Sequence, residues 1–185
     1  MNTADAELLH LAELIDGLGI AMLATRTEDG LVSRPVATLR GGSLTELWFF
    51  TSAASHKATE LATWPQVNLA FADVQRNRFV SVSGHASFER DRRRYESLWR
   101  EDMRAYFPGG RDDPDLRLVR VQMETAEYWE GPASAVGKAL SFALAAISGD
   151  ADQLGDNRTL ALEDGAALVV RGNTRGDAGR AEHGG

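Results

Sequence analysis

The chain has 185 residues, of which 43% are hydrophobic, and this suits one main domain with a substantial core. It has no cysteine, which excludes disulfides, thiolate catalysis and cysteine-bound zinc or iron–sulfur centres. The net charge of -7, from 20 basic and 27 acidic residues, argues against broad binding to nucleic acids or anionic membranes, so an anionic ligand would need a local positive pocket.

The first predicted element is an amphipathic helix over residues 5–17, where apolar residues recur at helical spacing until Gly17 and Gly19 interrupt the pattern. The N-terminal segment is acidic and amphipathic, unlike a leader peptide, in which a positively charged part precedes an apolar one. No apolar run approaches the roughly 18 residues that a membrane-spanning helix needs. We therefore expect a cytoplasmic protein with no membrane partner.

Alternating apolar and polar residues, or short aromatic runs, predict six strands in the next part of the chain. The clearest signal is a hairpin between the first two, because Asp29 and Gly30 can adopt the positive φ that a tight turn requires. Helical composition separates the third strand from the fourth at residues 55–64. In chain order, the predicted strands are residues 20–27, 31–40, 46–51, 66–73, 78–90 and 116–131.

Two further helices are predicted, one on each side of the sixth strand. Residues 134–148 are largely apolar, and residues 149–159 after them are typical of a loop. Residues 91–107 form the other helix, which ends before Pro108. Its apolar face is made of Tyr95, Leu98, Trp99, Met103 and Tyr106.

Short successive strands with turns and a few helices favour an antiparallel barrel over a parallel α/β sheet. We predict a mainly β (α+β) fold, a six-stranded antiparallel β-barrel with flanking helices. We assign this single domain to residues 1–172. The glycine-rich, charged residues 173–185 are typical of a disordered tail.

The stretch LWFFTSAASHKATEL, residues 47–61, runs from an aromatic strand into the start of a helix. At a helix start, free backbone N–H groups and the macrodipole favour an anion, and His56 and Lys57 would add positive charge. Such a site suits a phosphate. In the alternative, structural interpretation, Ser55 caps the helix and Lys57 is solvated. Arg34 favours the phosphate site if the second and third predicted strands pair, because it would then project toward the same place.

The sequence carries no other catalytic or metal-binding pattern. The remaining histidines, His10, His85 and His183, lack partners at ligand spacing, so we expect no metal. There is no nucleophile elbow, P-loop or dinucleotide-binding glycine motif, and adjacency alone does not make Ser55 and His56 a catalytic pair.

Two other features have structural and functional interpretations. The arginines of residues 89–104 are nearly balanced by acidic residues, which favours a solvated helix face over a nucleic-acid site. Trp129 ends the sixth predicted strand and is either a core residue or part of a pocket or subunit edge.

The order of several segments resembles a known family. The segments IAMLATRTEDGLVSRPVATL, LWFFTSAASHKATEL, VNLAFAD and FVSVSGHASF are together similar to the split-barrel flavin-binding proteins related to pyridoxamine 5'-phosphate oxidase. YWEGP and the apolar segment after it resemble the bacterial general stress proteins of that superfamily. The resemblance covers about residues 8–162. It implies a split β-barrel with FMN as cofactor and FAD as an alternative.

The resemblance also implies which residues bind the flavin and how the subunits assemble. In such proteins the flavin lies at the interface of a homodimer, and Trp129 would reach it from the other subunit. No residue is implied as a catalytic acid or base. The remaining implied flavin-binding residues are Arg34, Pro35 and Val36 along the flavin, Phe50 and Thr51 beside the isoalloxazine ring, and Ser55, His56 and Lys57 at the phosphate.

The chain departs from the oxidases at two places. Phe79 stands where they have a flavin-contacting glutamine, and the C-terminal part does not resemble the segment that reads a pyridoxal-type substrate. We therefore expect a homodimeric FMN-binding protein, interpreted as a flavin-dependent oxidoreductase of unknown substrate. One alternative is a non-catalytic flavin carrier or stress sensor. Another is a barrel that binds a deazaflavin or serves as a dimerisation module.

Overall fold

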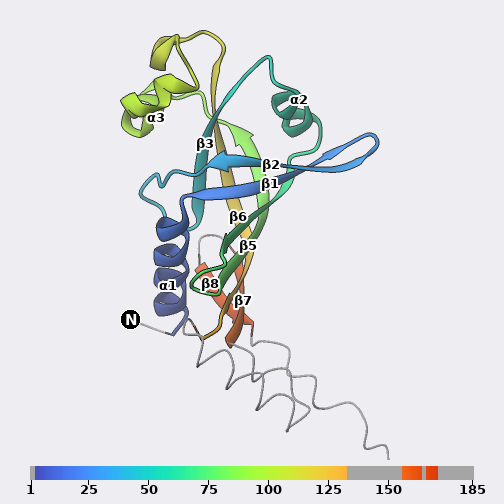
Figure 1. Ribbon diagram of the computed structural model, residues 1–185, viewed down its shortest axis with the longest axis vertical. Coiled ribbons are helices and arrows are strands. Elements are labelled where there is room, and N and C mark those ends of the chain that lie inside the picture. Colours follow the sequence, from blue (N-terminus) through green and yellow to red (C-terminus); the bar gives the residue numbers. More distant parts are fainter. Residues whose placement is uncertain (1–2, 133–155, 164–165, 171–185) are drawn as a thin grey trace, which may run out of the picture.

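The computed structural model describes residues 3–132, 156–163 and 166–170 (Figure 1). All pairings between their strands are antiparallel. The predicted mainly β fold is confirmed, and two strands are added to the six that we predicted. In chain order, the elements are α1 (Thr3–Leu18), β1 (Ile20–Thr27), β2 (Gly30–Ala37), β3 (Glu46–Ser52), α2 (His56–Thr63), β4 (Gln66–Asp73), β5 (Arg78–Phe88), α3 (Arg92–Leu98), the 3₁₀ helices η1 (Glu101–Ala105) and η2 (Gly110–Asp112), β6 (Leu116–Glu130), β7 (Asp156–Glu163) and β8 (Ala166–Val170).

The long strand β6 is central to the fold because it pairs with three others. Its first half lies between β3 and β5, and its second half lies between β5 and β7. The sheet continues from β5 through β4 and β1 to β2, and from β7 to β8. The β5–β6 ladder shifts register at Gly84, where a Cβ atom would lie 2.1 Å from the carbonyl oxygen of Gln122. Glycine therefore permits the close approach at the point where β6 passes from one partner to the next.

Two apolar clusters fill the fold, and β3 contributes to both. Along this strand, Leu47 and Phe49 belong to the larger cluster, whereas Trp48 and Phe50 belong to the smaller one. This alternation follows from the period of two of a strand. It directs Phe50 toward the segment that contains α3 and η1. The larger cluster is covered by the apolar stripe of α1, made of Leu8, Leu11, Leu14 and Ile15.

The predicted continuous helix over residues 91–107 is wrong. The helix α3 ends at Leu98, and Trp99 and Arg100 are extended, with ψ angles of 136° and 143°, before η1 begins. The break lets Trp99 lie edge-on to Phe50, with ring centroids 5.7 Å apart. Tyr106, which we had predicted on the apolar face, is instead 82% exposed. Tertiary packing on Phe50 thus overrides local helical propensity.

The loop predicted over residues 149–159 is also wrong in its last part, because β7 begins at Asp156 and forms a hairpin with β8. The second strand ends at Ala37 rather than at residue 40. The predicted helix over residues 134–148 and the predicted tail from residue 173 lie outside the described residues. None of the described helices combines the length and hydropathy needed to cross a bilayer.

Candidate functional site

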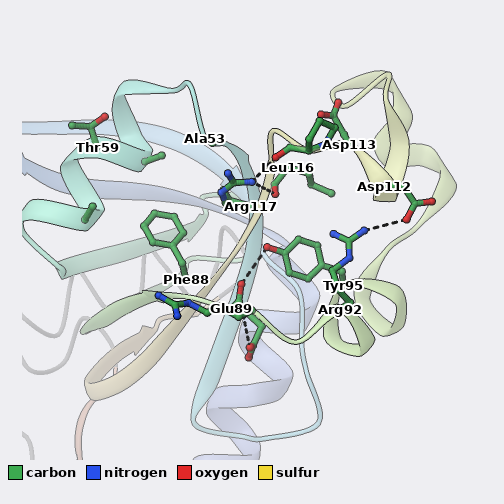
Figure 2. Close-up of a pocket in the computed structure, with 14 residues that line it drawn as sticks. Ala53, Thr59, Phe88, Glu89, Arg92, Tyr95, Asp112, Asp113, Leu116 and Arg117 are labelled. Carbon is green, nitrogen blue, oxygen red and sulfur yellow. Dashed lines mark hydrogen bonds and ion pairs between the residues drawn. The ribbon is translucent and has the colours of Figure 1, made fainter.

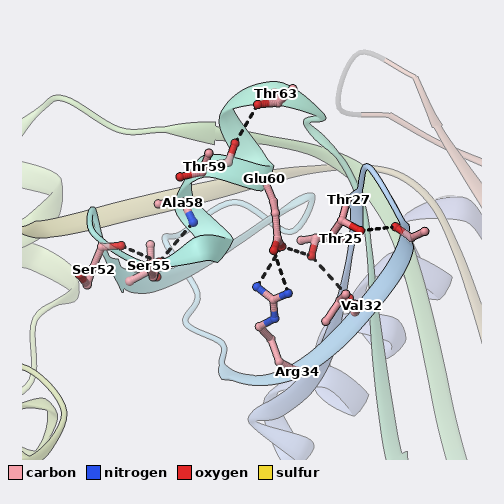
Figure 3. Close-up of polar contacts among 12 residues, drawn as sticks. Thr25, Thr27, Val32, Arg34, Ser52, Ser55, Ala58, Thr59, Glu60 and Thr63 are labelled. Atoms are coloured by element: carbon pink, nitrogen blue, oxygen red, sulfur yellow. Dashed lines mark hydrogen bonds and ion pairs between the residues drawn. The ribbon is translucent and has the colours of Figure 1, made fainter.

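The start of α2 is fixed by the Ser55 side chain, which bonds to the end of β3. Ser55 Oγ accepts the N–H of Ala58 at 3.2 Å and donates to the carbonyl oxygen of Ser52 at 2.7 Å (Figure 3). The buried hydroxyl of Thr51 lies 3.1 Å from Ser55 Oγ. Ser55 is therefore the N-cap that we expected. The backbone N–H groups of His56 and Lys57 come before the first intrahelical bond and have no acceptor within the helix.

A cavity of about 440 Å³ opens beside this helix start. Four of the predicted flavin-binding residues line it, from three different elements: Pro35 and Val36 from β2, Phe50 from β3 and Lys57 from α2. Its volume lies in the range of about 300 to 1,000 Å³ that is common for small-molecule and cofactor sites. The segment after α3 also lines the cavity, through Arg100, Asp102, Met103, Tyr106 and Phe107.

Lys57, which lines this cavity, is half-buried. Burial lowers the pKa of Lys57, the charge of Arg34 lowers it further, and the charge of Glu60 opposes both effects. The Nζ atom lies 5.5 Å from the centroid of the Phe49 ring. Across the described part of the chain, no carboxylate lies within ion-pair distance of Lys57. A partly desolvated cation without a counter-ion favours the binding of an anion.

Arg34 reaches α2 by a route that we did not predict. The strand β2 pairs with β1, and β3 pairs with β6. The second and third predicted strands, which we considered as a possible pair, meet only through an isolated bridge between Leu39 and Trp48. Arg34 nevertheless forms a two-pronged ion pair with Glu60 of α2, at 2.9 Å from Nη1 and 3.1 Å from Nη2 (Figure 3). Thr25 Oγ1 of β1 donates to the same carboxylate at 2.6 Å.

Glu60 is held in its ionised form by these contacts. Its burial raises the pKa, but the hydrogen bonds from Arg34 and Thr25 and the charges of Arg34 and His56 outweigh that effect, and the net pKa is lowered. Sequence reasoning did not single out Glu60. The available signal was its position three residues after Lys57, which places the two side chains on neighbouring parts of one helix surface.

The other predicted residues lie outside the cavity lining. Thr51 is buried and contacts the Ser55 cap, and the side chain of His56 is exposed at the first position of α2. Trp129 pairs with Phe79 near the end of β6 that is far from the Phe50 partner, Leu118. The structure therefore brings Pro35, Val36, Phe50 and Lys57 together, places Arg34 beside them, and leaves Trp129 apart within one chain.

A second, larger hollow of about 850 Å³ lies against the other side of α2 (Figure 2). Arg92 donates to Asp112 at 3.1 Å and lies over the Tyr95 ring at 4.9 Å. Arg117 donates to the carbonyl oxygens of Pro114 and Leu116. Both of these cations are therefore already neutralised or hydrogen-bonded within the chain. The helix side of this hollow is made of Ala58, Thr59 and Ala62.

Comparison with known proteins agrees with this architecture. The sequence profile of the family described as pyridoxamine 5'-phosphate oxidase like matches residues 6–153. The chain belongs to this family. It is 30% identical over 157 residues to Protein bli-3 of Neurospora crassa. The aligned region covers 78% of this chain and 75% of that protein.

Solved structures of the pyridoxamine 5'-phosphate oxidase-like family share the fold. The general stress FMN/FAD binding protein of Xanthomonas citri is 27% identical, with a TM-score of 0.62 over 70% of this chain and 92% of that chain. A general stress protein 26 of Jannaschia sp. CCS1 is 19% identical, with a TM-score of 0.66 over 85% of this chain and 99% of that chain. The family resemblance and the split-barrel fold read from the sequence are thus confirmed. The individual flavin-binding residues stay predictions.

Proposed function

We propose that this chain binds FMN in the cavity of about 440 Å³ beside α2. The observation that carries the proposal is Lys57, a half-buried lysine that lines the cavity and whose ammonium group has no carboxylate partner among the described residues. In this arrangement the phosphate lies at the free N–H groups of His56 and Lys57, where the helix dipole and the ammonium charge add together. Support also comes from the relatives, one of which is described as an FMN/FAD binding protein.

The cavity lining offers both positive charge and aromatic surface, and FMN has a phosphate and a flavin ring to match them. Lys57 lies at the start of α2, whereas Phe50 and Phe107 contribute ring surface, with their centroids 6.4 Å apart. Pro35 and Val36 would flank the flavin on the β2 side, and Arg34 would lie near the phosphate end. FAD, which carries the same flavin and a second phosphate, is the alternative cofactor.

We further propose that two copies assemble with the flavin at their interface. The β1–β2 hairpin exposes four large apolar side chains, and Ile20 both belongs to this set and lines the cavity. An apolar surface that continues into a cofactor cavity is typical of an interaction face. Trp129 of the second copy would complete the site. The exposed set is Ile20, Met22, Leu31 and Val32.

The proposed activity is that of a flavin-dependent oxidoreductase, because bound flavin supplies hydride or electron transfer at its N5 atom. The chain would contribute binding, orientation and positive charge, and we assign no residue as a catalytic acid or base. Stoichiometric flavin without turnover of nicotinamide donors would favour the carrier or sensor alternative. The cytoplasm stays the expected location.

An FMN titration of purified apoprotein, followed by flavin fluorescence, tests the proposal. We expect saturation near one FMN per chain and much weaker binding of riboflavin, because riboflavin lacks the phosphate. Equal affinities for the two ligands would contradict the phosphate site at Lys57. No binding of either ligand would contradict flavin binding and favour a deazaflavin or a dimerisation role.

A further inference from the structure

We propose that Glu60 is a positioning residue of the phosphate site and that it acts through Arg34. This inference rests on the proposed function, because it assigns a role to a residue beside the FMN phosphate. It goes beyond the predicted flavin-binding residues, which do not include Glu60. The Glu60 side chain is only 12% exposed, and it contacts Thr25 of β1 and Arg34 of β2 (Figure 3).

The Glu60 carboxylate is fixed from two strands at once. One oxygen accepts from Arg34 Nη1 at 2.9 Å and from the fully buried Thr25 hydroxyl at 2.6 Å, and the other accepts from Arg34 Nη2 at 3.1 Å. A buried carboxylate is costly unless it is paired and hydrogen-bonded. These three bonds meet that requirement, and they also determine where the guanidinium plane of Arg34 lies.

Arg34 keeps binding capacity after it pairs with Glu60. A guanidinium has five N–H donors, and the two-pronged contact uses one on each terminal nitrogen. The remaining donors are held in a fixed orientation, and the side chain is still 25% exposed. Arg34 is also adjacent in sequence to Pro35, which lines the cavity. Its position therefore suits a phosphate oxygen bound at the start of α2.

Glu60 also allows two cations to lie close together. The charge of Arg34 lowers the pKa of Lys57, whereas the charge of Glu60 raises it, so all three groups interact. Without the carboxylate, Arg34 and Lys57 would repel one another, and Arg34 would lose the contact that fixes its orientation. Loss of Glu60 would at the same time remove a negative charge that repels phosphate. We expect the positioning of Arg34 by Glu60 to affect FMN affinity more than the repulsion between Glu60 and the phosphate does.

This reasoning predicts that the effect of Glu60→Ala on FMN affinity changes sign when Arg34 is replaced. With Arg34 present, Glu60→Ala should weaken FMN binding because Arg34 is no longer held. With Arg34 replaced, the carboxylate of Glu60 has no guanidinium to position. It still favours the charged form of Lys57, but we expect its repulsion of the phosphate to be the larger effect. In an Arg34→Ala background, Glu60→Ala should therefore strengthen FMN binding. A purely structural role of Glu60 would weaken binding in both backgrounds.

The experiment measures FMN and riboflavin affinities of the full chain and of Glu60→Ala, Glu60→Gln, Arg34→Ala and the double variant. We expect Glu60→Ala to weaken FMN about 10-fold, within the range of one charge-assisted hydrogen bond. Riboflavin affinity should not change. Glu60→Gln should restore only part of the affinity, because its amide oxygen can still accept from Arg34 Nη1 and Thr25, whereas its NH2 group cannot accept from Arg34 Nη2.

Thr25→Val provides a milder test if Glu60→Ala does not fold. It removes the Thr25 bond to Glu60 without changing any charge, and we expect FMN to weaken a few-fold while riboflavin stays unchanged. No effect of either variant on FMN, or equal weakening of FMN and riboflavin, would overturn the role of Glu60. Equal weakening of FMN by Glu60→Ala in both Arg34 backgrounds would also overturn it. If the unmodified chain does not prefer FMN over riboflavin, the proposed function fails first, and this inference fails with it.

Discussion

The two sides of α2 differ in how their charges are satisfied. On one side, the smaller cavity contains Lys57, whose ammonium group has no carboxylate partner in the part of the chain that the structure describes. On the other side, the larger hollow contains Arg92, which pairs with Asp112, and Arg117, which is bound to backbone carbonyls. Arg90 also lines the larger hollow and has no ion pair among the described residues, but it is exposed, so its desolvation cost is small. A bound anion would therefore relieve an uncompensated desolvation cost mainly on the first side. Unsatisfied charge therefore identifies the candidate site better than the size of the hollow.

The largest expected effect comes from Lys57→Ala, on the side of α2 with the smaller cavity. We expect Lys57→Ala to weaken FMN binding by about 1.5 to 3 kcal/mol, or about 10-fold to 150-fold, which is typical of a charge-assisted hydrogen bond. The measurement is a fluorescence titration of apoprotein with FMN. Riboflavin is the control, and its affinity should barely change. Equal weakening of both ligands would show that Lys57 acts on the shape of the site and not on the phosphate.

A smaller effect is expected from the cap that shapes the same helix end. Ser55→Ala removes the bond to the Ala58 N–H and the contact with Thr51. We expect a loss of about 1 kcal/mol in the free energy of unfolding, as is common for an N-cap, measured by urea denaturation. FMN should weaken less than in Lys57→Ala, because the ammonium group is still present. Thr63→Ala, at the exposed end of α2, is the control and should change stability by less than about 0.5 kcal/mol. Equal losses from the two changes would contradict a specific role of the cap.

A third test uses the pH dependence of the free energy of unfolding, which reports whether Glu60 is ionised in the folded chain. The pKa of Glu60 is lowered from an ordinary value of 4.5 in the folded chain, against the opposing effect of burial, by Arg34 and Thr25. A carboxyl group with a depressed folded pKa stabilises the fold above its unfolded pKa, and this contribution is lost as the pH falls through the folded value. The difference in unfolding free energy between the unmodified chain and Glu60→Gln should therefore shrink as the pH is lowered below about 4.5.

Urea denaturation at a series of pH values measures this difference. The control repeats it in an Arg34→Ala background, where the largest favourable contact of Glu60 is missing and burial opposes ionisation. The shrinkage at low pH should there be reduced or reversed. A difference that grows on acidification in the presence of Arg34 would contradict the assignment of an ionised, stabilising Glu60.

Most of the barrel could be predicted from the sequence because its signals are local. The β1–β2 hairpin has Asp29 and Gly30 at the turn, and the alternation along β1, β4 and β5 marks their buried faces. The hairpin of β7 and β8 had a comparable signal, since the sequence Asp164-Gly165 separates two apolar stretches. We missed it because the glycine-rich, charged residues on both sides favoured a loop and a tail.

The features that we did not predict depend on contacts between segments that are far apart in the chain. Nothing local in residues 91–107 marks the break at Trp99, because the break is set by packing on Phe50 of β3. Likewise, Arg34 of β2 and Glu60 of α2 meet because α2 contacts β1 through Thr25, and β1 pairs with β2. The sequence indicated Lys57 and the cap Ser55 as a candidate anion site. It could not indicate the carboxylate that holds the neighbouring arginine.

The smallest expected effect comes from Arg92→Ala, on the side of α2 with the larger hollow. This variant is the matched control for Lys57→Ala. Arg92→Ala also removes one cation near this helix, but its partner Asp112 is exposed and its pairing is solvent-screened. We expect FMN affinity within about twofold of the unmodified chain, and a change in unfolding free energy below about 1 kcal/mol. If Arg92→Ala weakened FMN as much as Lys57→Ala, the phosphate would respond to the overall charge around α2 or would lie in the larger hollow. The contrast between a lone and a paired cation would then no longer identify the site.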